Sequence, residues 1–422
     1  MRRVAAVILD GLRRDFVRPE ATPNLARLKE RSTWFTAHRS AVPSVTRVCS
    51  SSFATGSYPA RHGLEGNSLA LLENDRLVIH DAGHPDFLQH RRRVTGKSLI
   101  VPTLAERIAE FGGAVTFSNV SPGAAYAHDP DGHGFVYHRT GSYGPGRDPV
   151  PEDAALNIGI DVAGDRAMTQ RFIKEALTDR RPALSLLWLG HPDTTQHEVP
   201  LGSPEHLQVL RDADDHVGLI IDRVNLLRAD KEDVLLIVGS DHGHQTVHAV
   251  VDVEDEVARL GFADPLAAGD LVVVPNGTAV LIYASPAGRR HVPALAERLR
   301  DQTWAGPVFA GEALGDIGQS DARGLAVFVS MASDDQPNEF GVPGRSFAAK
   351  PLAGKPDRLG CGQHGGLGAY EQSPFLMIDG VGFAPGAVRS SSCSLVDIAP
   401  TILAHLALPT EGCDGLPLQT TT

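Results

Sequence analysis

Short apolar runs rich in valine, isoleucine and leucine recur along the chain, and each is too brief to form a helix. The five clearest runs lie at residues 4–9, 114–118, 184–189, 234–239 and 375–380. Continuous apolar runs of this length are typical of strands that are buried on both faces of a parallel sheet. The pattern therefore predicts five buried parallel strands.

Between these runs, apolar residues recur with the period of an amphipathic helix. Residues 22–31, 101–113 and 165–177 follow this period, and so does a longer segment over 205–228. The stretch 395–408 predicts one more helix. Because strands alternate with helices, we expect an α/β fold with a doubly wound, mostly parallel sheet flanked by helices.

The pattern changes between residues 252 and 345, where strand, helix and strand segments alternate with several glycine and proline turns. We interpret 252–345 as an inserted α+β cap subdomain, with 1–251 and 346–422 forming the two parts of a catalytic core. The segment 118–138 follows a predicted strand. The sequence leaves open whether this segment is a loop over the site that binds a leaving group or a long surface connection.

The chain has 422 residues and a formal net charge of −12, with one short basic cluster at 90–93. This balance does not favour a groove for a nucleic acid polymer, whereas a small phosphorylated substrate fits if metal ions neutralise it.

The first apolar run is too short to span a membrane, so we expect a cytoplasmic protein without a membrane segment. Four cysteines without a CxxC pair favour neither a disulfide framework nor a thiolate zinc site. The oligomeric state is left open.

Side chains that can bind a metal ion directly follow three of the predicted strands. They are Asp10 after the first strand, Asp193 and His197 after the third, and Asp241, His242 and His244 after the fourth. Ligands bind at the carboxyl ends of strands in open α/β sheets, so these side chains are expected to converge. Carboxylate and imidazole ligands without thiolate suit zinc or manganese.

Each of these residues also has an ordinary structural explanation when it is considered alone. An aspartate after a strand is most often a helix cap or a turn residue. Convergence of three strand ends weakens that explanation, because Asp193 and His197 lie four residues apart and reach one ion from a single helical turn. His364 is flanked by glycines that let the backbone approach an ion, and the alternative is a histidine in a flexible loop.

The ordered set of motifs resembles the alkaline phosphatase superfamily, specifically its type I phosphodiesterase and nucleotide pyrophosphatase branch. The matching pieces are ILDGLRRD, PSVTRVCSSSFATGSYPARHGL, PTLAERIAEFG, HPDTTQH, SDHGH, GQHGG and VDIAPTILAHLAL. The resemblance runs over most of the chain and weakens across 252–345. It implies two divalent metal ions and a small phosphorylated or phosphonate substrate.

The resemblance also implies a division of the metal ligands between two ions. One ion takes Asp193, His197 and His364. The other ion takes Asp10, Asp241 and His242, together with the oxygen of the nucleophile. Zinc is the expected metal and manganese is left open, because a mixed oxygen and nitrogen set admits both.

In this family the nucleophile precedes the threonine of a Thr-Gly turn by nine residues, and that spacing implies Thr46. Sulfatases of the superfamily carry a cysteine at the nucleophile position. Here the cysteine is Cys49, three residues after Thr46, so the sequence lacks the group that a sulfatase needs. The resemblance implies an asparagine at position 49 that binds a phosphoryl oxygen, and a thiol is a poor donor. Arg47 and Asn67 are therefore the candidate substrate-binding residues.

Ser50, Ser51 and Ser52 are expected to open a helix behind the nucleophile, because small hydroxyl residues suit a first helical turn. Without a role in substrate binding, Arg47 would be an ordinary surface arginine and Asn67 an ordinary turn asparagine. None of these patterns identifies the group that replaces the asparagine.

The function implied by the resemblance is metal-dependent hydrolysis of phosphate diesters or phosphonate esters through a phospho-threonine intermediate. The same site also suits a phosphomonoesterase, a phosphonoacetate-type hydrolase or a phosphomutase. HGLEGN at 62–67 resembles the phosphonoacetate hydrolase pattern. A non-catalytic metal-binding protein on the same fold is the alternative from a different class. The physiological substrate and its leaving group are not identified by the sequence.

Overall fold

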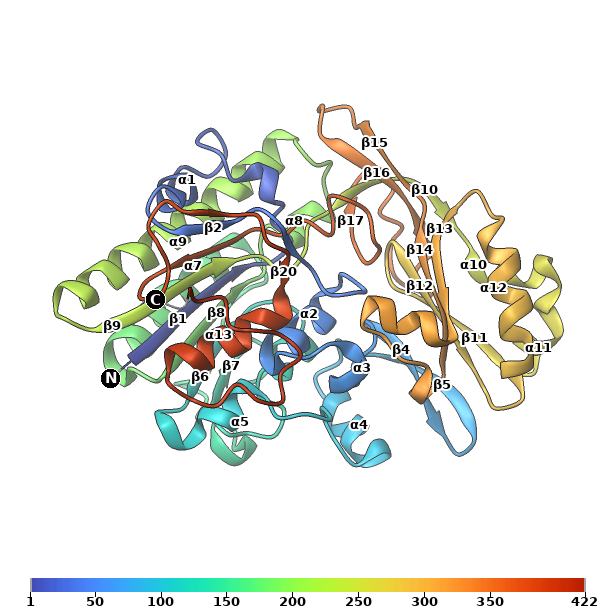
Figure 1. Cartoon of the computed structure of the whole chain (residues 1–422), viewed down its shortest axis with the longest axis horizontal. Coiled ribbons are helices and arrows are strands. Elements are labelled where there is room, and N and C mark those ends of the chain that lie inside the picture. Colours follow the sequence, from blue (N-terminus) through green and yellow to red (C-terminus); the bar gives the residue numbers. More distant parts are fainter. Residues whose placement is uncertain (1, 421–422) are drawn as a thin grey trace.

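A central eight-stranded sheet organises the larger part of the protein, seen in a computed structural model that describes residues 2–420 (Figure 1). Its strand order is β19-β2-β18-β9-β1-β8-β6-β7. The strands are β1 (Arg2–Leu9), β2 (Thr33–Phe35), β6 (Ala114–Ser118), β7 (Phe135–Tyr137), β8 (Leu184–Leu189), β9 (Asp233–Gly239), β18 (Leu376–Asp379) and β19 (Val388–Arg389). All five predicted strands are present.

The direction of the strands confirms a mostly parallel sheet and corrects one expectation. β1 runs parallel to β8 and β9, and β6 runs parallel to β7 and β8. β18, predicted as parallel, is antiparallel to both of its neighbours, β9 and β2. An apolar run that is buried on both faces has the same composition in either direction, so the sequence pattern does not separate the two cases.

Helices cover both faces of the central sheet, as a doubly wound fold requires. They include α1 (Pro23–Lys29), α2 (Thr46–Thr55), α5 (Leu104–Ile108), α7 (Val162–Arg171), α9 (Pro204–Ala229) and α13 (Ile398–His405). Alternate residues of β1 enter different cores: Val7 joins the apolar cluster that includes α9, whereas Ile8 joins the cluster that includes α2 and α13. This alternation follows from the two-residue period of a strand.

The predicted helices differ from the observed ones mainly at their ends. The segment 165–177 starts earlier, in α7, and continues as a π-helix over Phe172–Arg180, whereas 101–113 contains only α5 and a short 3-10 turn. α9 matches its prediction closely. Its first turn begins after Ser203, whose side chain accepts a hydrogen bond from the amide of His206, and this cap fixes where the helix starts.

A second, antiparallel sheet forms a separate layer on the right of Figure 1. Its order is β11-β12-β14-β13, with β11 (Leu271–Pro275), β12 (Ala279–Ala284), β13 (Ala305–Ala310) and β14 (Leu325–Met331). The segment that was expected to be one strand before the helix is thus the hairpin of β11 and β12, because the Asn276–Gly277 turn divides it. α10 (Val253–Val257) and α12 (Val292–Arg300) pack on one face.

The opposite face of this second sheet packs against a hairpin from the amino-terminal part of the chain. That hairpin consists of β4 (Ser68–Glu73) and β5 (Arg76–Asp81), followed by α4 (Phe87–Thr95). Leu69 of β4 and Phe87 of α4 share one apolar cluster with Leu281 and Phe328 of the second sheet. Segments outside 252–345 therefore contribute to this layer, and the proposed subdomain boundaries stay a prediction.

A small third sheet joins the two layers and lies beside the carboxyl ends of the central strands. Its order is β15-β16-β10-β17, with β10 (Gln245–Val251), β15 (Ser333–Pro337), β16 (Pro343–Ala349) and β17 (Gly362–Gln363). β10 and β17 pair in antiparallel fashion, with Gln245 opposite Gln363. This pairing brings the residues just before β10 next to the residues just after β17.

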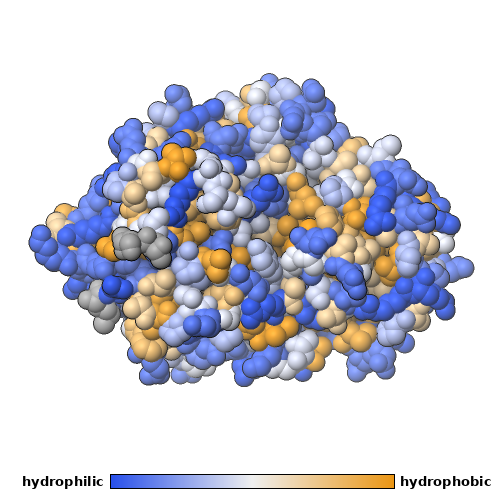
Figure 2. All heavy atoms as spheres, viewed as in Figure 1, coloured by the Kyte–Doolittle hydropathy of each residue, from blue (hydrophilic) through white to orange (hydrophobic). Residues whose placement is uncertain are grey.

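The face of the molecule shown in Figure 2 is mostly hydrophilic, with smaller hydrophobic patches between the polar side chains. Within residues 2–420, no helix combines the length and apolar character needed to cross a membrane.

Candidate metal centre and nucleophile

Three neighbouring strands of the central sheet deliver acidic side chains to one edge. Because β9, β1 and β8 are adjacent and parallel, their carboxyl ends lie together. Asp10 follows β1, Asp193 begins the short helix α8 (Asp193–Gln196) after β8, and Asp241 follows β9. The structure thus brings together the residues that the sequence placed at these three strand ends.

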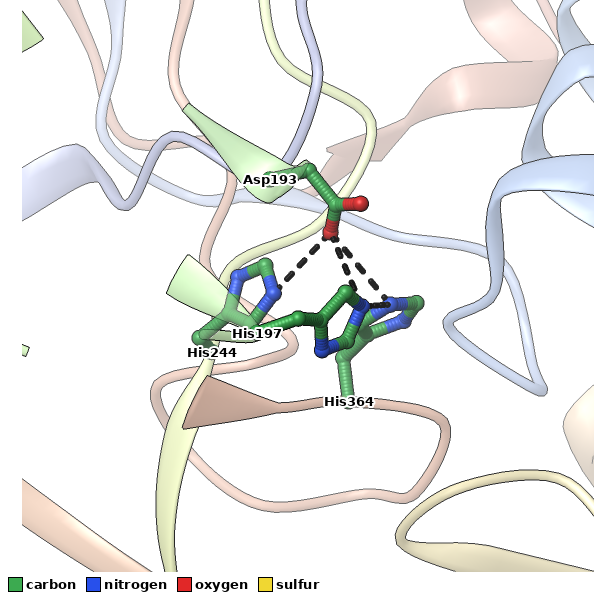
Figure 3. A group of neighbouring side chains, drawn as sticks. All are labelled: Asp193, His197, His244 and His364. Atoms are coloured by element: carbon green, nitrogen blue, oxygen red, sulfur yellow. Dashed lines mark hydrogen bonds and ion pairs between the residues drawn. The ribbon is translucent and has the colours of Figure 1, made fainter. Parts of the chain in front are cut away.

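Four side chains form a first cluster around one carboxylate oxygen, as Figure 3 shows. Asp193 Oδ1 lies 3.0 Å from His244 Nε2, 3.4 Å from His197 Nε2 and 3.5 Å from His364 Nε2. The Nε2 atoms of His197 and His364 are 3.3 Å apart. One carboxylate oxygen and three imidazole nitrogens therefore face a common centre.

Backbone carbonyls orient the three imidazole rings of this cluster. His364 Nδ1 donates to the carbonyl of Ser44 at 2.6 Å, and His197 Nδ1 donates to the carbonyl of Gly362 at 2.9 Å. His244 Nδ1 lies 3.2 Å from the carbonyl of Gly11. A proton on each Nδ1 leaves the lone pair of Nε2 directed at the centre, which is the arrangement a metal ligand needs.

Asp10, Asp241 and His242 form a second cluster, which is fully buried. His242 Nε2 lies 3.3 Å from Asp10 Oδ1 and 3.3 Å from Asp241 Oδ2. The other oxygen of each carboxylate is held by the protein, because Trp188 Nε1 donates to Asp10 Oδ2 and the amide of Gly11 donates to Asp241 Oδ1. One oxygen of each aspartate is left to face the cluster.

The donor atoms of both clusters fit a divalent metal ion. Asp10 Oδ1, Asp193 Oδ1, Asp241 Oδ2 and His244 Nε2 are buried without a hydrogen-bond partner among residues 2–420. Donors that bind one tetrahedral zinc ion at roughly 2.0–2.1 Å lie about 3.3 Å apart. The separations between 3.0 and 3.5 Å in the first cluster and of 3.3 Å in the second match that spacing.

The two clusters differ in their electrostatics. Burial opposes ionisation of Asp193, but the surrounding histidines outweigh burial and hold its pKa well below its usual value. Asp10 has a raised pKa, because it is buried and lies beside Asp241 and Asp193. Burial alone would lower the pKa of His242, yet Asp241 and Asp10 raise it to about 10. Without a cation, His242 is therefore the member of the second cluster that favours its protonated form at neutral pH.

Thr46 is the first residue of α2 and lies beside the second cluster. Val45 before it is extended, so the helix begins at Thr46 itself. Thr46 Oγ1 lies 3.3 Å from His242 Nε2. The expectation that Ser50, Ser51 and Ser52 open this helix is wrong, because they lie one turn further on and are buried.

Cys49 does not face the site, contrary to the role implied for position 49. Its side chain is fully buried in the core on the α2 face of the sheet. Cys49 Sγ lies 3.3 Å from Ser40 Oγ and donates to the carbonyl of Asp241 at 3.7 Å, and burial raises the pKa of the thiol. A side chain at this position packs against the sheet, so it does not reach a phosphoryl oxygen.

Arg47 and Asn67 both lie at the site, in different surroundings. Asn67 Oδ1 accepts a hydrogen bond of 3.1 Å from the backbone amide of Arg47, and its Nδ2 donates to none of residues 2–420. The Arg47 guanidinium lies 3.8 Å from the carboxylate of Asp81 and packs closely over Gly83. The side chain of Asn67 is thus held in place through Oδ1 and keeps its NH₂ group available to a ligand. The Arg47 side chain is directed instead at Asp81 in the cavity wall.

A cavity of about 730 Å³ opens in front of Thr46 and both clusters. Asp10, Asp193, His197 and His364 contribute to its lining. The segment 118–138 reaches the cavity through Val120, Ser121 and Pro122. It is not an irregular loop, because it contains α6 (Pro122–Ala127) and β7.

His244 is the donor that sequence reasoning did not assign to either ion. It follows β9 together with Asp241 and His242, but it turns toward Asp193 instead of joining its neighbours. The sequence held no signal for this separation, because residues 241–244 lie between β9 and β10 and no strand alternation assigns His242 and His244 to sides. The pairing of β10 with β17 then places His244 beside His364.

The fold and its motifs agree with known proteins. The profile of the type I phosphodiesterase / nucleotide pyrophosphatase family matches residues 4–309. Murine ectonucleotide pyrophosphatase / phosphodiesterase 5 is similar in structure, with a TM-score of 0.67 and 17% identity over 98% of this chain and 97% of that chain. An inactive variant of that murine protein in complex with AMP gives a TM-score of 0.66 with the same identity and coverage. No curated protein sequence matches this chain.

The family match extends from the first strand of the central sheet to β13 of the second sheet, which is more than half of the chain. It contains the segments that carry Asp10, Thr46, Asp193 and Asp241 in one continuous alignment. Divalent-metal dependence is a general trait of this family. The chain therefore belongs to the type I phosphodiesterase / nucleotide pyrophosphatase family of the alkaline phosphatase superfamily, and it is a hydrolase.

Proposed function

We propose that the protein hydrolyses phosphate diesters or phosphonate esters with two divalent metal ions and with Thr46 as the nucleophile. The observation that carries the proposal is the position of Thr46 Oγ1, 3.3 Å from His242 Nε2, at the start of a helix that faces the cavity. The nucleophile thus lies beside the cluster of donor atoms that suits one of the ions.

The ligand sets follow from the two clusters. Asp193, His197, His244 and His364 would hold one ion; Asp10, Asp241, His242 and the Thr46 oxygen would hold the other. Zinc fits the mixture of oxygen and nitrogen donors and their spacing, and manganese is the alternative. When bound, such a pair of ions activates an attacking oxygen and stabilises the charge that develops on the transferred phosphoryl group.

The chain's own residues supply attack, orientation and stabilisation. Thr46 gives up its hydroxyl proton to solvent and its Oγ1 attacks phosphorus, while the bond from phosphorus to the leaving oxygen breaks and that oxygen takes a proton from water. A water molecule then attacks phosphorus, breaks its bond to Thr46 Oγ1 and restores the hydroxyl. The free Nδ2 of Asn67 donates to a non-bridging oxygen. The positive amino-terminal end of the α2 dipole favours the same anion.

A second candidate, hydrolysis of a small polar phosphonate such as phosphonoacetate, is favoured by the lining of the cavity. Within residues 2–420 no phenylalanine, tyrosine or tryptophan lines it, so a nucleobase would have no such ring to stack on. Charged side chains, including Arg139, Lys355 and Arg358, lie in the wall instead. This wall suits a small charged leaving group better than a nucleoside.

The test compares Thr46→Ala with Thr46→Ser in purified, metal-loaded protein. We expect Thr46→Ala to keep its metal content but to lose at least about a thousandfold in turnover of bis-p-nitrophenyl phosphate or p-nitrophenyl phenylphosphonate. Thr46→Ser keeps the hydroxyl and should retain measurable activity. Mass spectrometry of rapidly quenched wild-type protein should detect phosphate on Thr46. Full activity in Thr46→Ala would refute the proposed nucleophile.

A substrate panel separates the alternative reactions of the same site. Phosphate diesters, phosphate monoesters and phosphonoacetate are offered to one preparation, and the products are identified by phosphorus NMR. Release of phosphate from phosphonoacetate alone would favour the second candidate. A phosphorylated isomer without free phosphate would identify a phosphomutase.

A further inference from the structure

A third group of metal-binding side chains lies outside the catalytic cavity. Glu73 ends β4, His80 lies near the end of β5, and His90 lies in α4. None of the three lines the cavity. The group therefore belongs to the β4–β5 hairpin and the helix that follows it, below the second sheet in Figure 1.

The three side chains converge on one carboxylate oxygen. Glu73 Oε1 lies 2.6 Å from His80 Nε2 and 2.9 Å from His90 Nε2. The two imidazole rings face each other with their centroids 4.7 Å apart. Two imidazole nitrogens and one carboxylate oxygen thus lie within reach of a single point.

This donor set has the composition of a zinc site with one open position. Two histidines and one glutamate are a known combination for zinc, with water as the fourth ligand. Donors around a tetrahedral zinc ion are about 3.3 Å apart, so the two hydrogen-bonded pairs would have to open by roughly half an ångström. The side chains are long enough to make that change by small rotations.

The access and charge of the group also suit an ion. The side chains of Glu73, His80 and His90 are 21%, 21% and 31% exposed, so solvent reaches them while the hairpin and α4 still hold them in place. Contacts with His80 and His90 hold the Glu73 carboxylate in position. An ionised carboxylate is the form that binds a cation.

A hydrogen-bonded triad without an ion is the simpler explanation, and it accounts for less of the arrangement. Both histidines direct Nε2 at the same oxygen, and exposed pairs of this kind contribute only about 0–1 kcal/mol each. Such a small gain gives little reason for two imidazoles from different elements to converge on one atom. A bound cation gives that convergence a function.

We propose that Glu73, His80 and His90 form a third divalent-metal site, best suited to zinc and separate from the catalytic pair. An ion there joins β4, β5 and α4 and so closes the hairpin onto the helix. The site also borders the catalytic cavity through the chain, because Asp81 directly follows His80. Asp81 accepts a hydrogen bond of 2.8 Å from the Gly83 amide, binds Lys355 and faces Arg47 in the cavity wall.

The experiment counts zinc in the full-length protein. Wild-type protein is saturated with zinc, separated from free metal on a desalting column and analysed by inductively coupled plasma mass spectrometry. We expect about three equivalents in the wild type and the loss of one equivalent in both His80→Ala and His90→Ala. Glu73→Gln keeps the size of the side chain but removes its charge, and it should weaken uptake of the third equivalent at least tenfold.

His248→Asn is the matched control, because it removes an exposed histidine that belongs to none of the three clusters. It should keep all three equivalents. Cobalt(II) substitution adds a spectroscopic readout, since a third equivalent in a low-coordinate site adds visible absorption that the two histidine variants lack. Circular dichroism verifies that each variant is folded. Two equivalents in the wild type, or a third that survives in both histidine variants, would overturn the proposal.

Discussion

The buried carboxylate of Glu371 holds the loop that carries His364, and replacing it with glutamine is a sharp test of how the metal centre is positioned. Glu371 is 1% exposed. Its Oε2 accepts hydrogen bonds from the Gly366 amide at 2.9 Å and from Thr278 Oγ1, and its Oε1 accepts from the Gly368 amide at 2.9 Å. Burial raises the pKa of Glu371, while these hydrogen bonds oppose the rise.

The magnitude follows from the number of donors that face the carboxylate. Glutamine has one oxygen and one NH₂ group, so its best orientation keeps Oε2 as the acceptor and turns the NH₂ group toward the Gly368 amide. That orientation loses one hydrogen bond and leaves two buried donors facing each other. A lost bond to a charged group and an unsatisfied buried donor together cost about 2–4 kcal/mol.

The same change reaches the proposed metal ligand His364 through Ser44. Ser44 Oγ accepts from the Gly365 amide at 3.0 Å and lies 3.4 Å from Glu371 Oε2, and the Ser44 carbonyl accepts from His364 Nδ1 at 2.6 Å. Displacement of this loop misdirects His364 Nε2. Disturbing groups that orient a metal ligand typically lowers metal affinity about 10–100-fold.

Two assays measure the two effects of Glu371→Gln. Thermal unfolding of the metal-free protein should show a melting temperature lower by roughly 2–5 °C, because the entropy of unfolding of a chain this long is about 0.9 kcal/mol/K. Competition with a zinc chelator should show the loss of affinity at the cluster that contains His364.

Glu65→Gln is the matched control. Glu65 is also buried and binds Arg323 Nε at 2.8 Å and the hydroxyl of Tyr283 at 3.0 Å, away from both metal clusters. It should lower stability without changing zinc affinity. Unchanged melting temperature and zinc affinity in Glu371→Gln would refute the reasoning, and equal losses of affinity in both variants would show that the effect is not specific to the loop.

Three further changes test the candidate site. His244→Leu removes a donor and should weaken zinc binding at the Asp193 cluster by about 100-fold in chelator competition, and unchanged affinity would exclude His244 as a ligand. The affinity of the second cluster for zinc should rise about tenfold per pH unit between pH 7 and 9. His242 has a pKa of about 10 in the metal-free protein and must release its proton before it binds the ion. An affinity that does not change with pH would contradict this. Asn67→Ala should lower kcat by about 10²–10³-fold in steady-state assays. Arg47→Ala should lower kcat by less than about tenfold, because the Arg47 side chain is directed at Asp81. A larger loss in Arg47→Ala than in Asn67→Ala would exchange the roles of the two residues.

The central sheet was predictable because its strands are buried on both faces and therefore appear as uninterrupted apolar runs. The order and direction of these strands could not be predicted, because tertiary packing decides which strands pair. The antiparallel β18 shows this: its residues are as apolar as those of β9 beside it. The hairpin of β11 and β12 was missed because a three-residue turn at 276–278 interrupts one long apolar segment.

The candidate site was predictable to the extent that strand ends and the family resemblance identify donors. The grouping of His244 with Asp193 depends on how β10 leaves the central sheet and pairs with β17, and a single sequence does not contain that pairing. The core position of Cys49 depends on which side of α2 packs against the sheet. β10 and β17 were not among the predicted strands, whereas a helix behind Thr46 was expected and its orientation was not.

The antiparallel contact between β10 and β17 also has a consequence for biosynthesis. Gln245 and Gln363 are opposite each other in this contact but are separated by more than a hundred residues in the chain. On the ribosome, the nascent chain exposes Asp10, Asp193 and His244 long before His364 is made. The first cluster is therefore incomplete until β17 and His364 have been synthesised, and a chain that stops before β17 lacks one of the four candidate donors.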